Sequence, residues 1–165
     1  MTNAKIKIIS CGGTFEKIYN PITGCLDFEK SHIENLIQKA RINEPIQIDV
    51  LMLVDSLDMT IDDRRKIVNC VLESPQEKII IIHGTDTMVE TAIEIAKNLK
   101  PSHTIILTGA MVPVSIKHSD AFFNLGFALA SLKLTKPGVW LAMNGELFSY
   151  SKVRKNTKAG CFESI

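Results

Sequence analysis

The sequence lacks the short motifs that mark many nucleotide-binding proteins and serine hydrolases. It has no Gly-x-x-x-x-Gly-Lys-Ser/Thr string, and no Gly-x-Gly-x-x-Gly follows its first apolar segment. Mononucleotide and dinucleotide binding therefore lose their usual sequence signals. A Gly-x-Ser-x-Gly turn is also absent, which removes the nucleophile of the α/β-hydrolase type.

Long apolar runs and an excess of one charge are missing as well. The 165-residue chain has a net charge of +1 at pH 7, with no basic stripe and no acidic tail. Nucleic acid and anionic membranes therefore gain no electrostatic support as partners. No apolar run approaches the roughly 20 residues that span a bilayer. Since the first residues also lack the apolar core of a signal peptide, we expect a cytoplasmic protein.

Cysteine is scarce and shows no pattern. Cys11, Cys25, Cys70 and Cys161 have no C-x-x-C spacing and no paired histidine. In a cytoplasmic chain such cysteines are reduced and mostly structural, so we expect neither a disulfide framework nor a metal centre.

The sequence does contain a regular alternation of strand-like and helix-like segments. Strands are predicted at 5–9, 46–54, 78–82, 104–108 and 138–143, and helices begin at Ser31, Thr60, Thr87 and Ser119, the last ending near Lys133. Ser31 with Glu34, and Thr87 with Glu90, have the spacing of capping boxes. The residues from Asn144 onward are polar and loop-like, with room for one short edge strand.

This β-α-β-α order predicts an α/β fold in which residues 1–165 form a single domain. The sheet is doubly wound and mostly parallel, with helices on both faces. Right-handed crossovers leave few topologies, and the commonest order of five such strands is the flavodoxin-like 2-1-3-4-5. Its switch point lies between strands 5–9 and 78–82. Ligands of such sheets bind beyond the carboxyl ends of the strands at this point.

A threonine next to glycine follows each of these two strands. Thr14 comes after Gly12-Gly13, and Thr85 comes after Gly84. Two hydroxyl groups at one crevice indicate a single reaction centre. Thr14 taken alone also fits a simple turn from strand to loop, so both interpretations stay open.

The segment after strand 78–82 has more polar residues than a helix start needs. Thr85, Asp86 and Thr87 are all good helix caps. The pairing of Thr87 with Glu90 leaves Thr85 and Asp86 unexplained by capping, which favours a function for them. We interpret His83 as a buried, hydrogen-bonded histidine rather than a catalytic base.

Other polar side chains have two interpretations each. Ser56, after strand 46–54, either hydrogen-bonds a substrate carboxylate or stabilises its loop. Tyr19 either closes over Thr14 as part of a lid or is an ordinary loop aromatic. A basic run near the C-terminus would usually be solvated, and its spacing singles out no member; it contains Lys152, Arg154, Lys155 and Lys158.

The helix that begins near Ser119 is apolar on two sides. One side holds Phe122, Leu125, Leu129 and Leu132, and the other holds Phe123, Phe127 and Ala130. A helix that is apolar on two sides is buried on both. We therefore hypothesise that this helix forms part of a homo-oligomer interface.

Five short stretches form a set when taken in order. They are Gly12-Gly13-Thr14, His83-Gly84-Thr85-Asp86-Thr87-Met88, Leu107-Thr108-Gly109-Ala110-Met111, Ser119-Asp120 with Asn124-Leu125, and more weakly Asp55-Ser56-Leu57-Asp58-Met59. Together they resemble the bacterial-type asparaginase/glutaminase family of threonine amidohydrolases. The string from His83 to Met88 is long and specific, and the order and spacing fit from residue 5 to about residue 160.

The resemblance implies five catalytic residues and three substrate contacts. The catalytic roles fall on Thr14 as the nucleophile, Tyr19 as its lid partner, and Thr85, Asp86 and Lys155 as a second triad. Ser56 would hold the substrate carboxylate, Asp86 would meet the ammonium, and the backbone carbonyl of Ala110 would face the amide nitrogen.

The family implies hydrolysis of L-asparagine to L-aspartate and ammonia through an acyl-threonine ester, without a cofactor. One alternative is glutamine or another amide as substrate, and another is a module that binds aspartate or asparagine with weak turnover. A thiol attack by Cys11 is a further hypothesis. The residues leave open which threonine attacks first, and whether Lys155 takes a proton or stabilises charge.

Three departures from the family pattern bear on these expectations. Typical members continue into a second, smaller domain, so we expect a short single-domain member. Leu57 stands where many members have glutamine, which removes a contact near the substrate carboxylate and disfavours glutamine as substrate. Residues 15–17 after Thr14 are Phe-Glu-Lys rather than small residues, so we expect a different lid.

Overall fold

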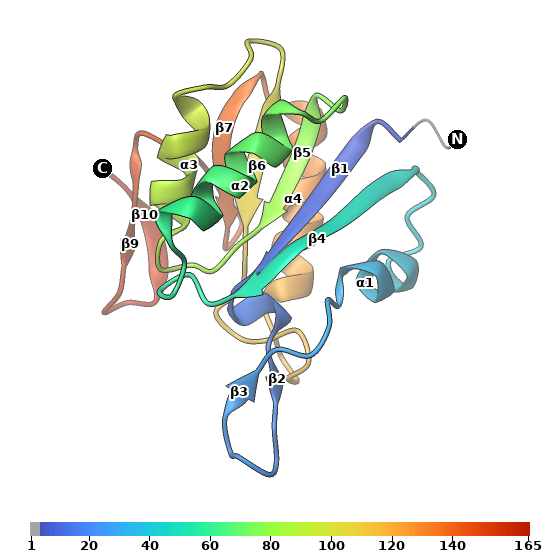
Figure 1. Ribbon diagram of the computed structural model, residues 1–165, viewed down its shortest axis with the longest axis vertical. Coiled ribbons are helices and arrows are strands. Elements are labelled where there is room, and N and C mark those ends of the chain that lie inside the picture. The colour runs from blue at the N-terminus through green and yellow to red at the C-terminus, as the bar shows by residue number, and fades with distance from the viewer. Residues whose placement is uncertain (1–3) are drawn as a thin grey trace.

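Six strands form the central sheet of the structure, a computed structural model that describes residues 4–165 (Figure 1). They are β1 (Ile6–Gly12), β4 (Ile46–Val54), β5 (Lys78–Ile82), β6 (Thr104–Thr108), β7 (Gly138–Met143) and β8 (Glu146–Ser149). Their order is β4-β1-β5-β6-β7-β8. The first five are parallel, which confirms the predicted strands and the 2-1-3-4-5 order, and β8 pairs antiparallel with β7.

Helices cover both faces of the sheet because its central strands are apolar on both sides. Alternate side chains of a strand point to opposite faces. In β5, Ile79 and Ile81 pack in one core with α2 (Ile61–Leu72) and α3 (Met88–Ala96). Ile80 and Ile82 pack in a second core with α1 (Ile33–Lys39) and α4 (Ala121–Leu134). The doubly wound architecture is therefore confirmed, and Figure 1 shows α2 and α3 in front of the sheet and α4 behind it.

Among the α-helices of residues 4–165, α2 alone has a capping bond from its N-cap side chain. Oγ1 of Thr60 accepts from the backbone N–H of Asp63, whose side chain accepts from the backbone N–H of Thr60, and α2 follows. The capping boxes predicted at Ser31 and Thr87 are wrong. α1 begins after His32 and α3 begins after Thr87, and neither cap residue makes a side-chain capping bond.

The hydroxyl groups of Ser31 and Thr87 donate to distant partners, although Oγ of Ser31 also accepts from the backbone N–H of Ile33 at 3.3 Å. Oγ of Ser31 donates to the carboxylate of Glu16 at 2.6 Å, and Oγ1 of Thr87 donates to the carbonyl oxygen of Ser56 at 2.9 Å. A short-range sequence pattern contains no information about such partners. α4 also begins later than predicted, at Ala121.

Two small antiparallel hairpins lie outside the main sheet. The 3-10 helix η1 (Thr14–Glu16) leads into β2 (Ile18–Tyr19) and β3 (Leu26–Asp27), which project at the bottom of Figure 1. β9 (Val153–Asn156) pairs with β10 (Cys161–Ser164), and Val153 and Phe162 are buried in the core on the α3 side. The short edge strand allowed after Asn144 is present as β8, but the loop-like remainder predicted there is wrong, because β9 and β10 also lie in it.

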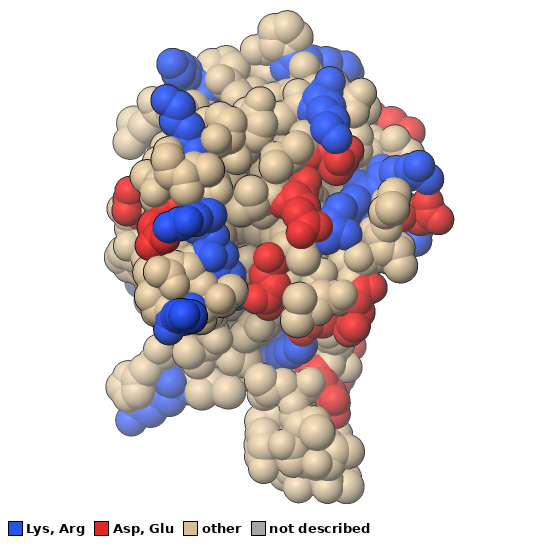
Figure 2. All heavy atoms as spheres, turned by 90° about the vertical axis from the view of Figure 1, so that its left-hand side faces the viewer, with Lys and Arg blue, Asp and Glu red and all other residues tan. Residues whose placement is uncertain are grey.

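Charged side chains of both signs are interspersed on the face shown in Figure 2. The β2–β3 hairpin that projects at the bottom is different, since residues 18–26 contain no Lys, Arg, Asp or Glu. None of the helices within residues 4–165 has the length and apolar character needed to cross a membrane.

Candidate active site

Lys155 connects the β9–β10 hairpin to the turn that follows β5. Its Nζ donates to Oγ1 of Thr85 and to Oδ1 of Asp86, both at 2.7 Å. The lysine side chain is 11% exposed and that of Asp86 is 38% exposed, so the amine is enclosed while the carboxylate opens to solvent. Three predicted residues thus meet, although 70 positions separate Thr85 from Lys155.

Two glycines let the loops after β1, β4 and β5 touch each other closely. A Cβ on Gly13 would lie 2.4 Å from Cα of Gly84, and a Cβ on Gly84 would lie 2.5 Å from Cβ of Ser56. Neither position has room for a side chain, and both contacts depend on glycine. The loops that carry Thr14, Ser56 and Thr85 therefore meet at one end of the sheet, at the crevice predicted between β1 and β5.

Ser56 is a buried residue with an unpaired hydroxyl group. The residue is 1% exposed, and its Oγ has no hydrogen-bond partner among residues 4–165. Its carbonyl oxygen, by contrast, accepts the hydrogen bond from Thr87. A buried hydroxyl without a partner costs free energy, so a polar ligand atom placed there would gain a hydrogen bond.

Thr14 begins η1, which a buried carboxylate holds in place. Gly13 precedes it with φ of 71°, a left-handed conformation that favours glycine. Glu16 is fully buried and accepts from Oγ of Ser10 at 2.5 Å and from the backbone N–H of His32 at 2.7 Å. Thr14 itself is partly exposed, so it lies on the open side of this turn.

Tyr19 lies on the β2–β3 hairpin, outside the main sheet. It is on β2 and 57% exposed, and within the described chain no hydrogen bond joins it to Thr14. The base of this hairpin is held by Lys17, whose Nζ donates to Asp55 at 2.5 Å and whose carbonyl oxygen accepts from Oγ of Ser115 at 2.9 Å. The lid role of Tyr19 stays a prediction.

The start of α4 holds the loop that carries Ala110. Nδ2 of Asn124 donates to the carbonyl oxygen of Gly109 at 3.0 Å, and Asp120 accepts from the two backbone N–H groups after Ala110 at 3.0–3.1 Å. A Cβ on Gly109 would lie 2.4 Å from the carbonyl oxygen of His83, so this loop packs on the turn after β5. The sequence alone gives Asp120 and Asn124 no role, and the structure shows that they position the backbone around Ala110.

His83 is buried and hydrogen-bonded, as predicted. Its Nδ1 lies 2.8 Å from the carbonyl oxygen of Gly84, and its Nε2 lies 2.9 Å from Oγ1 of Thr91. Burial lowers the pKa of His83 to about 4, and the charge of Arg64 adds to this, while the bond to Gly84 opposes it. Since a carbonyl oxygen only accepts, Nδ1 of the neutral ring carries the proton and Thr91 donates to Nε2.

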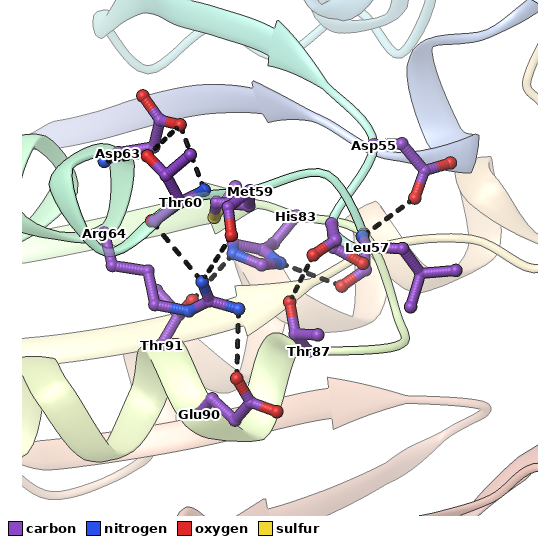
Figure 3. A network of polar contacts seen from close by, with 12 residues as sticks. Asp55, Leu57, Met59, Thr60, Asp63, Arg64, His83, Thr87, Glu90 and Thr91 are labelled. Atoms are coloured by element: carbon purple, nitrogen blue, oxygen red, sulfur yellow. Dashed lines mark hydrogen bonds and ion pairs between the residues drawn. The ribbon is translucent and has the colours of Figure 1, made fainter.

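Arg64 ties the loop after β4 to α3, as Figure 3 shows. Its guanidinium donates to the carbonyl oxygen of Met59 at 2.8 Å and to the carboxylate of Glu90 at 3.0 Å. Together with the bond from Thr87 to Ser56, this pair attaches the Ser56 loop to the start of α3 at two points. The sequence alone does not single out Arg64, because its carboxylate partner lies 26 positions away.

Cys11 does not support the hypothesis of a thiol nucleophile. It is fully buried in the core on the α2 side, and burial raises the pKa of its thiol. A thiol that stays protonated and inaccessible is not a nucleophile, so that hypothesis is wrong. All four cysteines are free. Residues 4–165 contain no group of three or more His, Cys, Asp or Glu arranged to hold a metal ion.

The chain is similar to proteins of one family. The family model described as "Asparaginase, N-terminal" matches residues 5–165. L-asparaginase of Thermococcus kodakarensis is 33% identical over 90 residues, which are 53% of this chain and 27% of the relative. A subunit of the glutamyl-tRNA(Gln) amidotransferase of Methanobrevibacter smithii is 30% identical over 161 residues, 93% of this chain and 36% of the relative. Glutaminase-asparaginase of Acinetobacter glutaminasificans is 28% identical over 162 residues, 91% of this chain and 49% of the relative.

Two solved structures have the same arrangement of elements. The thermostable L-asparaginase from Thermococcus kodakarensis matches with a TM-score of 0.84 and 26% identity, over 97% of this chain and 51% of that chain. A probable cytoplasmic L-asparaginase from Campylobacter jejuni matches with a TM-score of 0.81 and 28% identity, over 98% and 53%. The chain thus spans about half of these structures, and about a quarter to a half of the curated relatives.

Proposed function

Because the chain belongs to the asparaginase family, we propose that it is an amidohydrolase that converts L-asparagine to L-aspartate and ammonia. The observation that carries this proposal is the contact of Lys155 with Thr85 and Asp86, next to the glycine contact that places the Thr14 loop. The likeness of the fold to an L-asparaginase supports it. The proposed reaction uses no cofactor.

In the proposed reaction the hydroxyl oxygen of Thr14 attacks the carbon of the side-chain amide. The amide C–N bond breaks, the proton of the Thr14 hydroxyl passes to the leaving nitrogen to give ammonia, and an ester to Thr14 remains. Water then hydrolyses this ester and releases aspartate. Backbone N–H groups at the strand ends stabilise the tetrahedral oxyanion, where one such donor is typically worth ~3 kcal/mol.

Lys155 supplies positive charge to this centre. Its Nζ donates to both Thr85 and Asp86, and an ammonium group only donates and cannot take a proton. We therefore assign to Lys155 the stabilisation of negative charge during attack. In this assignment the hydroxyl of Thr85, which accepts from Lys155, orients the groups that transfer protons to and from Thr14.

The substrate offers three polar groups, and the crevice offers a partner for each. The ammonium would pair with Asp86, whose carboxylate is 38% exposed. The substrate carboxylate would accept from the unpaired hydroxyl of Ser56. The amide nitrogen would donate to the carbonyl oxygen of Ala110, and Tyr19 would close over the bound molecule as a lid.

A second candidate is hydrolysis of glutamine or of another amide whose ammonia goes to a partner enzyme. The relative from Methanobrevibacter smithii is named as part of an amidotransferase, and it matches 93% of this chain. The relative from Acinetobacter glutaminasificans is named for both amides. Leu57, at 71% exposure, favours asparagine, because it offers no amide contact at the carboxylate side.

Ammonia release by the purified, folded protein tests the proposal, with asparagine and glutamine each at millimolar concentration. Release from asparagine supports the leading candidate, and release from glutamine alone supports the second. Absence of release from both amides would overturn the leading candidate and would also exclude glutamine as the substrate of the second. Aspartate binding in calorimetry without any ammonia release would identify a binding module instead.

We also propose that the protein acts in the cytoplasm on a small-molecule amide, with residues 1–165 as one asparaginase-like α/β domain. A solved relative is named as cytoplasmic, which supports this location. We also propose that the protein self-associates, since α4 has exposed apolar residues.

A further inference from the structure

Arg64 joins the end of the loop after β4 to the first turn of α3. Nη1 of its guanidinium donates to the carbonyl oxygens of Met59 at 2.8 Å and Thr60 at 3.4 Å. Nη2 donates to the carboxylate of Glu90 at 3.0 Å. The Arg64 side chain is 11% exposed and that of Glu90 is 66% exposed. One enclosed guanidinium thus connects the loop to the helix, as Figure 3 shows.

The loop that Arg64 holds is short and carries Ser56. It runs from residue 55 to residue 60, between β4 and α2. Near its start, Oγ1 of Thr87 donates to the carbonyl oxygen of Ser56 at 2.9 Å, and at its end Arg64 connects it to Glu90. Thr87 and Glu90 are three positions apart at the start of α3, so both supports lie on one face of the same turn. A shift of Ser56 away from α3 would therefore break or stretch these bonds.

Ser56 is fixed from its other side by the turn after β5. A Cβ on Gly84 would lie 2.5 Å from both Cβ and Oγ of Ser56, so backbone packs directly on this side chain. The hydroxyl group is buried and has no partner among residues 4–165. A group that is already in place loses less conformational entropy when a ligand binds, so its contribution to affinity depends on its supports. Arg64 is one of those supports, although it belongs to α2.

We propose that Arg64 is a positioning residue for substrate binding, which holds Ser56 in place to receive the substrate carboxylate. The inference rests on the proposed function, in which Ser56 binds that carboxylate. Without the guanidinium, the carbonyl oxygen of Met59, a residue that is 6% exposed, loses its donor, and a shift of the loop toward water replaces that bond. The shift moves Ser56 and weakens carboxylate binding. Thr14 lies on η1, which Glu16 holds independently, so the chemical step should keep its rate.

Calorimetric binding of L-aspartate, the proposed product, tests the inference without any need for turnover. Arg64→Met should weaken binding about tenfold, because a hydrogen bond to a charged group contributes at least that much. Arg65→Met is the matched control. It removes the same charge one position away, where the side chain is 72% exposed and pairs with Asp62, so binding should stay at the native level.

Glu90→Ala cuts the same attachment from the side of α3. Because the Glu90 side chain is exposed, this variant should fold even if Arg64→Met does not. It should weaken aspartate binding too, although it removes a negative charge. A long-range effect of charge alone would make the two variants differ in sign, since aspartate carries a net negative charge. Weakening in both variants thus identifies the attachment as the cause.

A double-mutant cycle with Ser56→Ala shows whether Arg64 acts through Ser56. Ser56→Ala removes a hydroxyl without a partner, so the free protein loses no hydrogen bond of that group. The double variant Ser56→Ala with Arg64→Met should bind aspartate no more weakly than Ser56→Ala alone. In turnover of asparagine, Arg64→Met should raise KM about tenfold and leave kcat within about twofold, as the loss of uniform binding does. A general loosening of the crevice would lower kcat as well.

Aspartate binding of native strength in folded Arg64→Met or in Glu90→Ala overturns the inference. Additive weakening in the double variant, or equal weakening in Arg65→Met, overturns it as well. Native protein that binds aspartate but releases no ammonia would contradict the proposed function alone, and the comparison of binding strengths would still decide the role of Arg64. Native protein that binds no aspartate at about 10 mM overturns both.

Discussion

The ring of His83 donates from Nδ1 to the carbonyl oxygen of Gly84 at 2.8 Å, and Gly84 in turn lies against both Gly13 and Ser56. A buried imidazole therefore holds the peptide at which three strand-end loops meet. The loops that carry the proposed nucleophile and the proposed carboxylate contact share this support. Changes at His83 should thus affect the whole crevice and not one residue in it.

Protonation of His83 should lower stability as the pH falls from about 6.5 to about 4. The folded pKa is about 4, below the ordinary value near 6.5. Between these pH values the unfolded chain binds a proton that the folded chain does not bind. The free energy of unfolding therefore rises with pH, and the contribution of His83 reaches its full value above about pH 6.5. The loss at pH 4 is about 3 kcal/mol.

Urea unfolding at several pH values checks this expectation in native protein and in His83→Asn. The asparagine amide still donates to Gly84 but does not titrate, so its stability should change little between pH 6.5 and 4.5. Carboxylates with a lowered pKa, such as Asp49 and Asp55, titrate below this window. Equal slopes in both proteins would show that His83 is not the group responsible.

Lys155→Met should abolish turnover and leave the fold intact. The side chain supplies the charge next to Thr85 and Asp86, and loss of one such group typically costs 100-fold or more in kcat, about 3 kcal/mol. Ammonia release and circular dichroism measure the two effects. Lys158→Met is the matched control, because Lys158 is an exposed lysine on the same hairpin. Turnover near the native rate in Lys155→Met would remove Lys155 from the proposed mechanism.

Gly84→Ala should be inactive and less stable. The new methyl group would lie 2.5 Å from Cβ of Ser56, so the β4 and β5 loops must separate, at a cost of about 2 kcal/mol or more. Chemical unfolding and ammonia release measure the change. Gly126→Ala is the control at submicromolar concentration, and it should gain up to about 1 kcal/mol because its site is open and helical. Equal stability of the two variants would contradict the packing argument.

Lys17→Met should loosen the β2–β3 hairpin. The Lys17 and Asp55 side chains are only 17% and 25% exposed, and the bond joins the hairpin base to the Ser56 loop. Burial tends to raise the pKa of Asp55, but bonds from Lys17 and from the N–H of Leu57 hold it below its usual value. Amide exchange in residues 18–27 should become roughly tenfold faster.

The control for the hairpin experiment is Lys66→Met. Lys66 forms an exposed pair with Asp63 on α2, and such a pair contributes little. Its loss should leave exchange in the hairpin unchanged. If Lys17→Met leaves hairpin exchange unchanged too, Lys17 does not hold the hairpin base.

The sheet was predictable because burial on both faces leaves a simple signal. Residues 78–82 are nearly all isoleucine, and no exposed loop or surface helix has that composition. The handedness of crossovers then restricts the order of the strands. The crevice between β1 and β5 follows from that order, and so does the meeting of the Thr14 and Thr85 loops.

The predictions that were wrong or could not be made concern residues whose contacts lie far away in the sequence. Ser31 and Thr87 have good capping spacing, but Glu16 and the Ser56 carbonyl take their hydroxyl groups. Lys155 could not be distinguished from neighbouring basic residues by spacing, and only the resemblance selected it. Its place beside Thr85 depends on the β9–β10 hairpin. The strands of this hairpin are too short and polar to show the alternation of apolar and polar residues that predicts a strand.

The candidate triad is divided between two pieces of structure with separate hydrogen-bond ladders. Thr85 and Asp86 follow the six-stranded sheet, whereas Lys155 is carried by the two-stranded β9–β10 hairpin. Local opening of the hairpin would remove Lys155 while the sheet stayed intact. A fully folded preparation could then contain inactive molecules, and its specific activity would report the closure of this hairpin as well as the amount of folded protein.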